Sequence, residues 1–166
     1  MIVAGNWKMN LNINEAIELS NGLLKHNEVL VEEKIIIFPS FLIIPEIYNL
    51  YKNSKISIGA QDCSMYNNGA FTGQVSAEMI KDAGCKYVII GHSERRSLCH
   101  ETSSIVSLKA VKAISAGLKV IICIGENSID REKGDYLFVL EDQLKHSLFD
   151  ISIDSCLLYT SDAADD

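Results

Sequence analysis

Short apolar runs rich in isoleucine and valine recur along the chain and predict buried β-strands. They begin near Ile2, Ile35, Ile56, Tyr87 and Val120. Each run is only a few residues long and shows no alternation of apolar and polar positions, which is typical of strands covered on both faces. The pattern therefore predicts five strands of a largely parallel sheet.

Segments with apolar residues three and four positions apart lie between these runs and predict helices. One extends from Ile13 to Leu24, with Asn12 or Asn14 as its N-cap. The apolar faces of two others consist of Val106, Ala110, Ala113, Ile114 and Gly117, and of Leu137, Leu140, Leu144 and Leu148, with Glu141 and Lys145 facing away. Alternating strands and helices belong either to an open doubly wound sheet or to a closed (β/α)₈ barrel.

Chain length bears on this choice. The sequence has 166 residues, whereas a complete (β/α)₈ barrel has roughly 250 residues, with about 200 as a lower bound. With 48% hydrophobic and 22% charged residues, the composition is that of a globular domain. We therefore expect one domain, formed either by an open sheet or by part of a barrel.

Charge and cysteine content exclude some classes of protein. The formal net charge is −7 and the pI is near 5.1, so we expect no nucleic-acid partner. The five cysteines form no C-x-x-C pair, and an odd number favours a reducing compartment. No signal-peptide pattern and no apolar run of membrane-spanning length is present, so we expect a cytoplasmic protein without membrane association.

Two polar motifs directly follow predicted strands, where α/β folds bind their ligands. In Gly5–Asn10 (GNWKMN), Lys8 would supply a fixed positive charge for an anionic substrate, and Asn6 would orient that substrate by hydrogen bonds. A lysine after a strand is also common as an ordinary surface residue. The second motif, Gly91–Arg96 (GHSERR), follows the strand that begins at Tyr87.

His92 in the second motif precedes a predicted short helix, whose N-terminal partial positive charge disfavours an imidazolium. A neutral imidazole can donate its N–H to a carbonyl and stabilise an enediolate, although a histidine satisfied in a turn is the alternative. Glu94 could pair with Arg95 or Lys8 as a first-turn acid. We expect Arg95 and Arg96 to form structural or interface ion pairs.

A long glycine-bearing loop covers residues 59–74, with Phe71 and Thr72 near its tip. Loops longer than about twelve residues are usually functional, and this one would insert into a partner unless it is an ordinary surface loop. The fifth strand ends in Cys123–Glu126 (CIGE). Because no histidine is close to Cys123 in sequence, we expect a buried structural cysteine.

Together and in this order, these motifs resemble the triosephosphate isomerase family. The matching stretches are Gly5–Asn10, Gly69–Gly73 (GAFTG), Tyr87–Arg96 (YVIIGHSERR) and Cys123–Glu126. The resemblance covers residues 1 to about 154 and the first five of that family's eight βα units. It implies a (β/α)₈ TIM barrel, truncated here to a partial barrel over residues 1–154.

The resemblance also implies a reaction and roles for residues. The family interconverts dihydroxyacetone phosphate and glyceraldehyde 3-phosphate, in glycolysis and gluconeogenesis, without a metal or organic cofactor. By resemblance, Asn6 and Lys8 bind the substrate, His92 is the neutral electrophile, Glu94 positions the lysine, and Ser93 supports the site. Thr72 and Phe71 correspond to the loop that enters a second subunit, which implies a homodimer of the intact protein. At the position of Gln74 the family more usually has a glutamate that reaches toward an arginine of the His92 loop, so the resemblance implies that this ion pair becomes a neutral hydrogen bond.

The catalytic base of the family has no counterpart in the sequence. That glutamate follows the sixth strand, and the family is the standard example of such a base acting with a neutral histidine. Glu126, Glu132 and Glu141 lie in or before the fifth helix and cannot replace it. We therefore expect the 166-residue chain to be inactive. A non-catalytic phosphate-binding α/β domain is the alternative.

The alternation of predicted strands and helices stops after Asp150. Cys156–Asp166 (CLLYTSDAADD) is the translation of an oligonucleotide that resembles the adapter of transposase-based sequencing libraries. We therefore expect residues 155–166 to be a non-native tail that carries no information about the native fold. In such a fragment, the strands near Ile2 and Val120 would both be sheet edges.

Overall fold

A single parallel sheet organises the chain. The computed structural model describes residues 2–26, 34–151 and 156–160. Its strands are β1 (Ile2–Asn6), β2 (Lys34–Phe38), β3 (Ser57–Ala60), β4 (Tyr87–Ile90), β5 (Lys119–Ile124) and β6 (Cys156–Thr160). Each strand pairs in parallel with the next one in sequence, in the order β1-β2-β3-β4-β5-β6. The five strands expected from the sequence are thus confirmed to within two residues at their starts.

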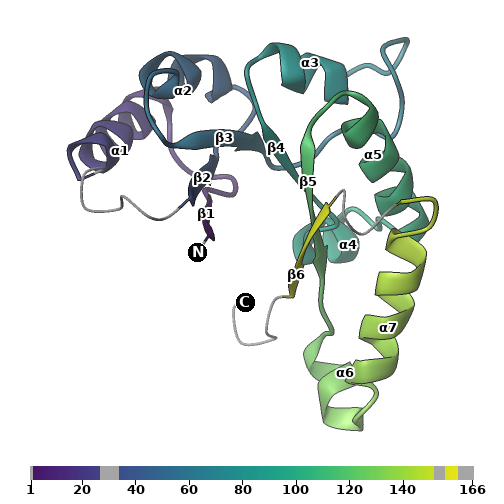
Figure 1. The fold of residues 1–166 in the computed structure, drawn as a ribbon. Coiled ribbons are helices and arrows are strands. Elements are labelled where there is room, and N and C mark those ends of the chain that lie inside the picture. The colour runs from purple at the N-terminus through teal and green to yellow at the C-terminus, as the bar shows by residue number, and fades with distance from the viewer. Residues whose placement is uncertain (1, 27–33, 152–155, 161–166) are drawn as a thin grey trace.

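Helices connect the strands along the outer side of the curved sheet (Figure 1). They are α1 (Ile13–Lys25), α2 (Ile44–Tyr51), α3 (Ala77–Asp82), α4 (Ser93–Leu98), α5 (Ser103–Ser115), α6 (Ser128–Lys133) and α7 (Tyr136–Ser147). An open doubly wound sheet has helices on both faces and a strand order that reverses, whereas sequential parallel strands with helices outside form a barrel wall. The partial barrel expected from the sequence is therefore confirmed.

The core has two layers because alternate strand residues point to opposite faces. The inner layer consists of Ile36, Phe38, Tyr87, Ile89, Ile121 and Cys123, all buried. Their neighbours along the strands, among them Val88 and Val120, pack in a second cluster together with helix residues such as Ala16 and Ala110. Burial on both faces explains why β2, β4 and β5 show no polar alternation.

The two edges of the sheet differ from expectation. Strand β1 is an edge, and its Ile2 and Val3 side chains are 44% and 43% exposed, so it is not covered on both faces. Strand β5 is not an edge, because Cys156–Thr160 pairs with it in parallel from Val120 to Ile124. The expectation that the strand near Val120 is a sheet edge is therefore wrong. A short apolar segment can satisfy the backbone groups of an open strand edge whatever its origin.

Helix boundaries refine the sequence analysis. Asn12, not Asn14, caps α1: its Oδ1 accepts from the Glu15 N–H at 3.1 Å, while Glu15 Oε2 accepts from the Asn12 N–H at 2.8 Å. Gly117 lies beyond the end of α5 with φ +76°, a conformation that favours glycine.

Leu137 is 66% exposed rather than buried, because the first turn of α7 lies beside α6 and away from α5 (Figure 1).

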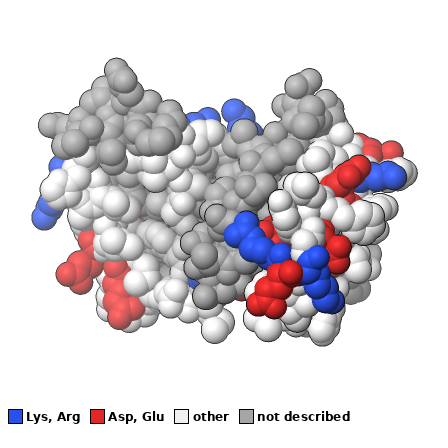
Figure 2. Space-filling model, turned by 90° about the horizontal axis from the view of Figure 1, so that it is seen from below, with Lys and Arg blue, Asp and Glu red and all other residues white. Residues whose placement is uncertain are grey.

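Two surface properties bear on possible partners. On the face shown in Figure 2, acidic and basic side chains of the described residues lie next to one another rather than in a continuous basic patch. No helix in the described part of the chain combines the length and apolar character needed to cross a bilayer.

We predict that Gly59→Ala destabilises the fold, because the inner layer has no room for a side chain there. A Cβ at position 59 would lie 2.2 Å from Cε1 of Phe38, whose side chain is fully buried and cannot move into solvent. The expected loss in the free energy of unfolding is about 1–3 kcal/mol, measured by urea denaturation. The control is Gly22→Ala in α1, where nothing lies within 4 Å of the added Cβ. It should stabilise the protein by roughly 0.5–1 kcal/mol. Equal effects of the two substitutions would contradict the packing argument.

Candidate active site

Residues that follow different strands meet at one rim of the sheet because parallel strands all end there. Lys8 follows β1, and Glu94 lies in the first turn of α4 after β4. Lys8 Nζ is 2.9 Å from Glu94 Oε1, and His92 Nδ1 is 3.3 Å from Glu94 Oε2. The three residues expected to be catalytic thus form one group, hereafter the rim cluster, in which Glu94 bridges the lysine and the histidine.

The backbone contact of His92 bears on which of its two ring nitrogens carries a hydrogen. His92 is the N-cap residue of α4, and its Nδ1 accepts from the Glu94 N–H at 3.4 Å. This contact requires an unprotonated Nδ1, whereas the nearby Glu94 carboxylate would favour a proton there. The backbone N–H has no acceptor within the first helical turn, while the carboxylate is half exposed and already paired with Lys8. The backbone contact therefore favours the tautomer that carries its proton on Nε2.

Lys8 has an unusual backbone that neighbouring side chains support. Its φ is +52°, in the left-handed region, which costs a non-glycine residue about 1–3 kcal/mol. Asn6 Oδ1 accepts from the Lys8 N–H at 3.0 Å. Gln61 Nε2 donates to the carbonyl oxygens of Lys8 at 2.9 Å and Phe38 at 2.7 Å. Strained backbone of this kind persists only where surrounding contacts hold it.

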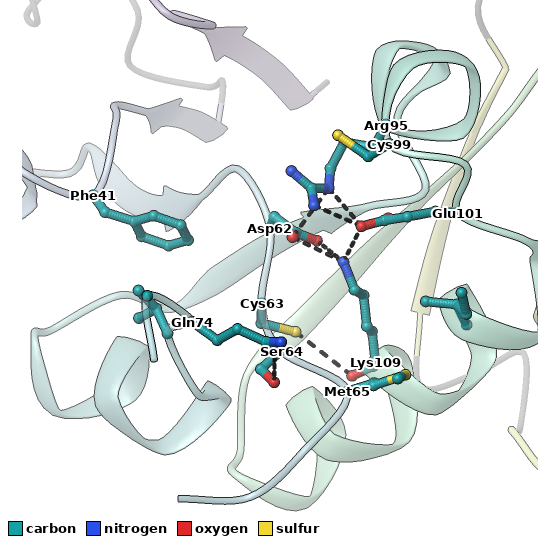
Figure 3. Close-up of a pocket in the computed structure, with 13 residues that line it drawn as sticks. Phe41, Asp62, Cys63, Ser64, Met65, Gln74, Arg95, Cys99, Glu101 and Lys109 are labelled. Atoms are coloured by element: carbon teal, nitrogen blue, oxygen red, sulfur yellow. Dashed lines mark hydrogen bonds and ion pairs between the residues drawn. The ribbon is translucent and has the colours of Figure 1, made fainter. Parts of the chain in front are cut away.

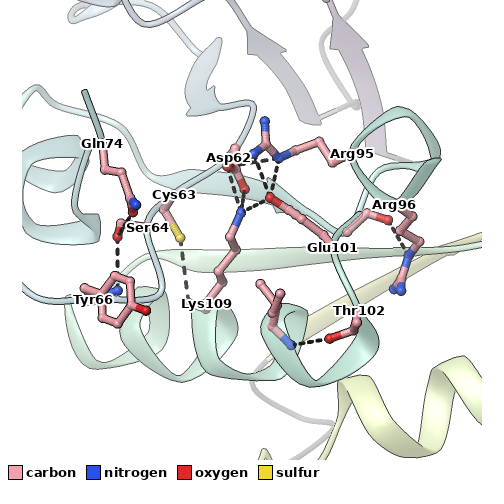
Figure 4. Close-up of polar contacts among 12 residues, drawn as sticks. Asp62, Cys63, Ser64, Tyr66, Gln74, Arg95, Arg96, Glu101, Thr102 and Lys109 are labelled. Atoms are coloured by element: carbon pink, nitrogen blue, oxygen red, sulfur yellow. Dashed lines mark hydrogen bonds and ion pairs between the residues drawn. The ribbon is translucent and has the colours of Figure 1, made fainter. Parts of the chain in front are cut away.

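Four charged residues, hereafter the buried charge cluster, contact one another beside the start of α5: Asp62, Arg95, Glu101 and Lys109 (Figures 3 and 4). Lys109 Nζ contacts Asp62 Oδ1 at 2.7 Å and Glu101 Oε1 at 2.5 Å. Arg95 contacts Asp62 at 3.0 Å and Glu101 at 2.6 Å. Two cations and two anions balance, which makes their burial tolerable. Arg95 thus pairs with these acids and not with Glu94.

Burial and pairing move the acid pKa values of this cluster in opposite directions. Burial raises the pKa of Asp62 above its ordinary value, although the Lys109 ammonium partly offsets that rise. Burial alone would also raise the pKa of Glu101, but hydrogen bonds from Arg95 and Lys109 outweigh it, and the pKa of Glu101 is lowered. The cationic partners therefore more than compensate for burial at Glu101 but only partly at Asp62.

A pocket of about 390 Å³ opens beside the buried charge cluster (Figure 3). Its lining includes Phe41, Gln74 and Cys99 besides the four charged residues, but not the rim cluster. Gln74 comes from the long loop, where its Oε1 accepts from the Ser64 hydroxyl at 2.5 Å.

The long loop between β3 and α3 exposes every residue from 66 to 74, including Phe71 and Thr72. The rings of Tyr66 and Phe71 stack with centroids 4.2 Å apart and an interplanar angle of 2°. With the Ser64–Gln74 hydrogen bond, this stacking braces the loop internally.

Arg96 and Cys123 have structural roles at the ends of β4 and β5. The Arg96 guanidinium donates to the carbonyl oxygens of Gly91 at 2.8 Å and Cys123 at 3.1 Å, which ties the ends of β4 and β5 together. Burial raises the pKa of the Cys123 thiol to about 11, partly offset by Arg96, so the thiol is not an activated nucleophile. Both residues match the structural roles expected of them. Ser93 begins α4 directly after His92.

Sequence reasoning missed Gln61 and three members of the buried charge cluster. Gln61 and Asp62 follow β3 directly, and their place at a strand end was the available signal. Glu101 and Lys109 carry no such signal because their pairing depends on the packing of α5 against the loop. Among the described residues, no group of three or more His, Cys, Asp or Glu side chains could hold a metal ion.

Comparisons with known proteins agree on one family. The family model described as triosephosphate isomerase matches residues 1–158. Triosephosphate isomerases of Prosthecochloris aestuarii and Lawsonia intracellularis are each 45% identical to this chain, over 89% and 91% of its length, but the matches cover only 59% and 60% of theirs. The crystal structure of triosephosphate isomerase from Bartonella henselae superposes with a TM-score of 0.85 at 31% identity, covering 98% of this chain and 68% of that one.

We predict that Lys109→Met destabilises the protein in a pH-dependent way. The substitution leaves two buried carboxylates with one cation, which should cost about 3–5 kcal/mol at pH 7. Without the ammonium, the pKa of Asp62 in the folded state rises further above its unfolded value of about 3.9. A raised folded pKa favours the folded state at low pH, and this benefit is lost as pH rises.

The deficit of Lys109→Met relative to the unsubstituted protein should therefore shrink between pH 7 and about pH 4, as measured by urea denaturation. Lys112→Met, on the same helix but outside the cluster, is the control and should show a small deficit at every pH. A deficit of Lys109→Met that does not change with pH would show that packing, not charge, causes it.

Proposed function

Because this chain belongs to the triosephosphate isomerase family, we propose that the protein of which it is a part interconverts dihydroxyacetone phosphate and glyceraldehyde 3-phosphate. The chain spans about 60% of the length of the curated relatives it matches, so the proposal concerns the whole protein. The observation that carries it is the rim cluster, in which a lysine ammonium, an imidazole and a bridging carboxylate lie together.

Lys8 and Asn6 would bind the substrate. The Lys8 ammonium supplies a positive charge for the phosphate and for the enediolate that forms during the reaction. The Oδ1 atom of Asn6 accepts from the Lys8 backbone, so its amide N–H₂ is the part that can donate to a substrate oxygen. Ser93 follows His92 and would support the same binding region.

His92 would act as the electrophile. With Nδ1 accepting from the backbone of α4, the Nε2–H is left as the donor of a neutral imidazole. A neutral donor can share its proton with either of two adjacent substrate oxygens as negative charge moves between them. Glu94 would hold the lysine in place, since its carboxylate contacts both Lys8 and His92.

The 166-residue chain would be inactive by itself. Proton removal from the carbon next to the carbonyl needs a base, and the residues of the rim cluster serve other roles. Glu126 is turned toward Arg131, 3.0 Å away, which argues against its use as that base. We also propose that residues 1–154 are the native partial barrel and that residues 155–166 are a non-native tail, on the ground of the adapter-like reading of Cys156–Asp166.

The intact protein would be a homodimer. Phe71 and Thr72 lie at the tip of the long loop, in a stretch that is fully exposed in the single chain. Because the stacked Tyr66–Phe71 pair and the Ser64–Gln74 bond brace the loop, it needs little ordering to enter a second subunit.

A non-catalytic phosphate-binding domain is the second candidate. It is favoured because Glu94, the carboxylate beside Lys8 and His92 at the rim, is already paired with both of them and is therefore poorly placed to act as a base. Binding of triose phosphate without turnover by the full-length protein would support it.

We predict isomerase activity for the full-length protein, obtained by reading the source DNA from an independent library across and beyond codon 154. The frame should continue through a sixth strand that bears a glutamate. The encoded protein should interconvert the two triose phosphates in a coupled spectrophotometric assay, while the 166-residue chain should show negligible turnover. In the full-length protein, Lys8→Ala should lower kcat/KM by well over about tenfold, because the enediolate loses its counter-charge.

Lys112→Ala in the full-length protein is the control for this assay and should keep normal activity. Near-normal turnover by the 166-residue chain would refute its proposed inactivity. A Lys8→Ala variant within tenfold of its parent would count against the assigned role of Lys8. A gene that ends after Asp166 would leave the phosphate-binding domain as the better explanation.

We predict that Thr72→Arg makes the full-length protein monomeric. Thr72 is exposed in the single chain, so the substitution should leave folding intact while placing a large cation at the dimer contact. Sedimentation velocity at micromolar concentration should show half the mass of the unsubstituted protein. Glu18→Arg on the exposed side of α1 is the control and should stay dimeric. An unchanged mass for Thr72→Arg would argue against this loop as the dimer contact.

A further inference from the structure

The ion pair between Lys8 and Glu94 cannot by itself define where the Lys8 ammonium lies. The two side chains are 41% and 42% exposed, and exposed pairs of long side chains are held only weakly in one geometry. The position of the ammonium must therefore depend on the backbone from which the side chain leaves. That backbone is in the left-handed region at φ +52°, which an isolated lysine rarely adopts.

Gln61 holds this backbone by using both hydrogens of its side-chain amide. One is donated to the Lys8 carbonyl oxygen at 2.9 Å and the other to the Phe38 carbonyl oxygen at 2.7 Å. The Phe38 carbonyl also accepts from the Trp7 N–H at 3.1 Å. The amide of Gln61 thus joins the turn after β1 to the end of β2.

Gln61 is itself fixed by the residue that follows it. Asp62 is bound by Lys109 at 2.7 Å and by Arg95 at 3.0 Å, and Arg95 is the neighbour of Glu94 in α4 (Figure 4). The dipeptide Gln61–Asp62 therefore contacts the backbone of Lys8 through Gln61 and the helix that bears Glu94 through Asp62. This arrangement constrains the distance between the two members of the ion pair through contacts that are less exposed than the pair itself.

We infer that Gln61 is a positioning residue for the reaction, acting through Lys8. Its amide keeps the Lys8 backbone in the left-handed conformation, so that the ammonium stays where an anionic substrate binds. Gln61 does not need to touch the substrate for this role. The inference rests on the proposed function for its link to catalysis, but its link to phosphate binding can be measured separately.

The test uses the full-length protein and two substitutions. Gln61→Leu removes both donors, and Gln61→Glu keeps the size of the side chain but presents carboxylate oxygens to two carbonyl oxygens. Each should lower kcat/KM and weaken binding of glycerol 3-phosphate, a three-carbon phosphate without a carbonyl, by about tenfold. Calorimetry measures the affinity, and urea denaturation gives the fraction folded.

Gln143→Leu is the matched control. The amide of Gln143 also holds backbone, donating to the Gly125 carbonyl at 2.8 Å and accepting from the Gly125 N–H at 3.0 Å, but it does not contact Lys8. Its loss should lower stability with little effect on glycerol 3-phosphate affinity. A tenfold loss of affinity in this control as well would overturn the inference.

A double-variant cycle separates positioning from general support. If Gln61 acts through the Lys8 ammonium, adding Gln61→Leu to Lys8→Ala should change glycerol 3-phosphate affinity by less than about twofold. Independent tenfold losses in the double variant would overturn the inference. Should the unsubstituted protein bind glycerol 3-phosphate but show no turnover, the proposed isomerase function fails while the binding cycle still decides the role of Gln61.

Discussion

The parallel register of the sheet is the constraint on which the rest of the structure depends. Because every strand runs in the same direction, the residues that follow β1, β3 and β4 emerge at one rim. Lys8, Gln61 and His92 lie far apart in sequence, yet this register places them within reach of one another or of Glu94. Strands running in alternate directions would divide them between two rims and leave no site.

The rim cluster and the buried charge cluster differ in their exposure to solvent. The buried charge cluster is the less accessible of the two: the side chains of Lys109 and Glu101 are only 6% and 7% exposed, Asp62 is 14% exposed and Arg95 is 35% exposed. In the rim cluster, Lys8 and Glu94 are 41% and 42% exposed and His92 is 21% exposed, which leaves the proposed site open to a small molecule. Asp62 and Gln61 connect the two clusters, because Asp62 belongs to the buried charge cluster and Gln61 holds the backbone of Lys8.

The features that the sequence predicted are local, and those it did not predict depend on packing. Apolar runs located the strands, and Asn12 was one of two N-cap candidates because asparagine is favoured at a helix start. Exposure of Leu137 could not be foreseen, because periodicity tells which face a residue is on but not whether a neighbour covers it. Pairing of Glu101 with Lys109 depends on how the start of α5 packs against the β3 loop. The role of Gln61 could not be predicted either, because its partners are backbone carbonyl oxygens, which carry no sequence signature.

The residues proposed to form the electrophilic half of the site are held together without the later strands. Lys8, His92 and Glu94 take their positions from β1, β4 and from contacts that begin at β3, so the part of the chain described up to β5 holds them together. Strand β6 adds backbone pairing to β5, which requires no particular side chains. A base supplied from beyond β5 would therefore meet an electrophile that is already in place. Because stabilising an enediolate and forming one are separate tasks, the fold can assign them to different strands without coupling their geometry.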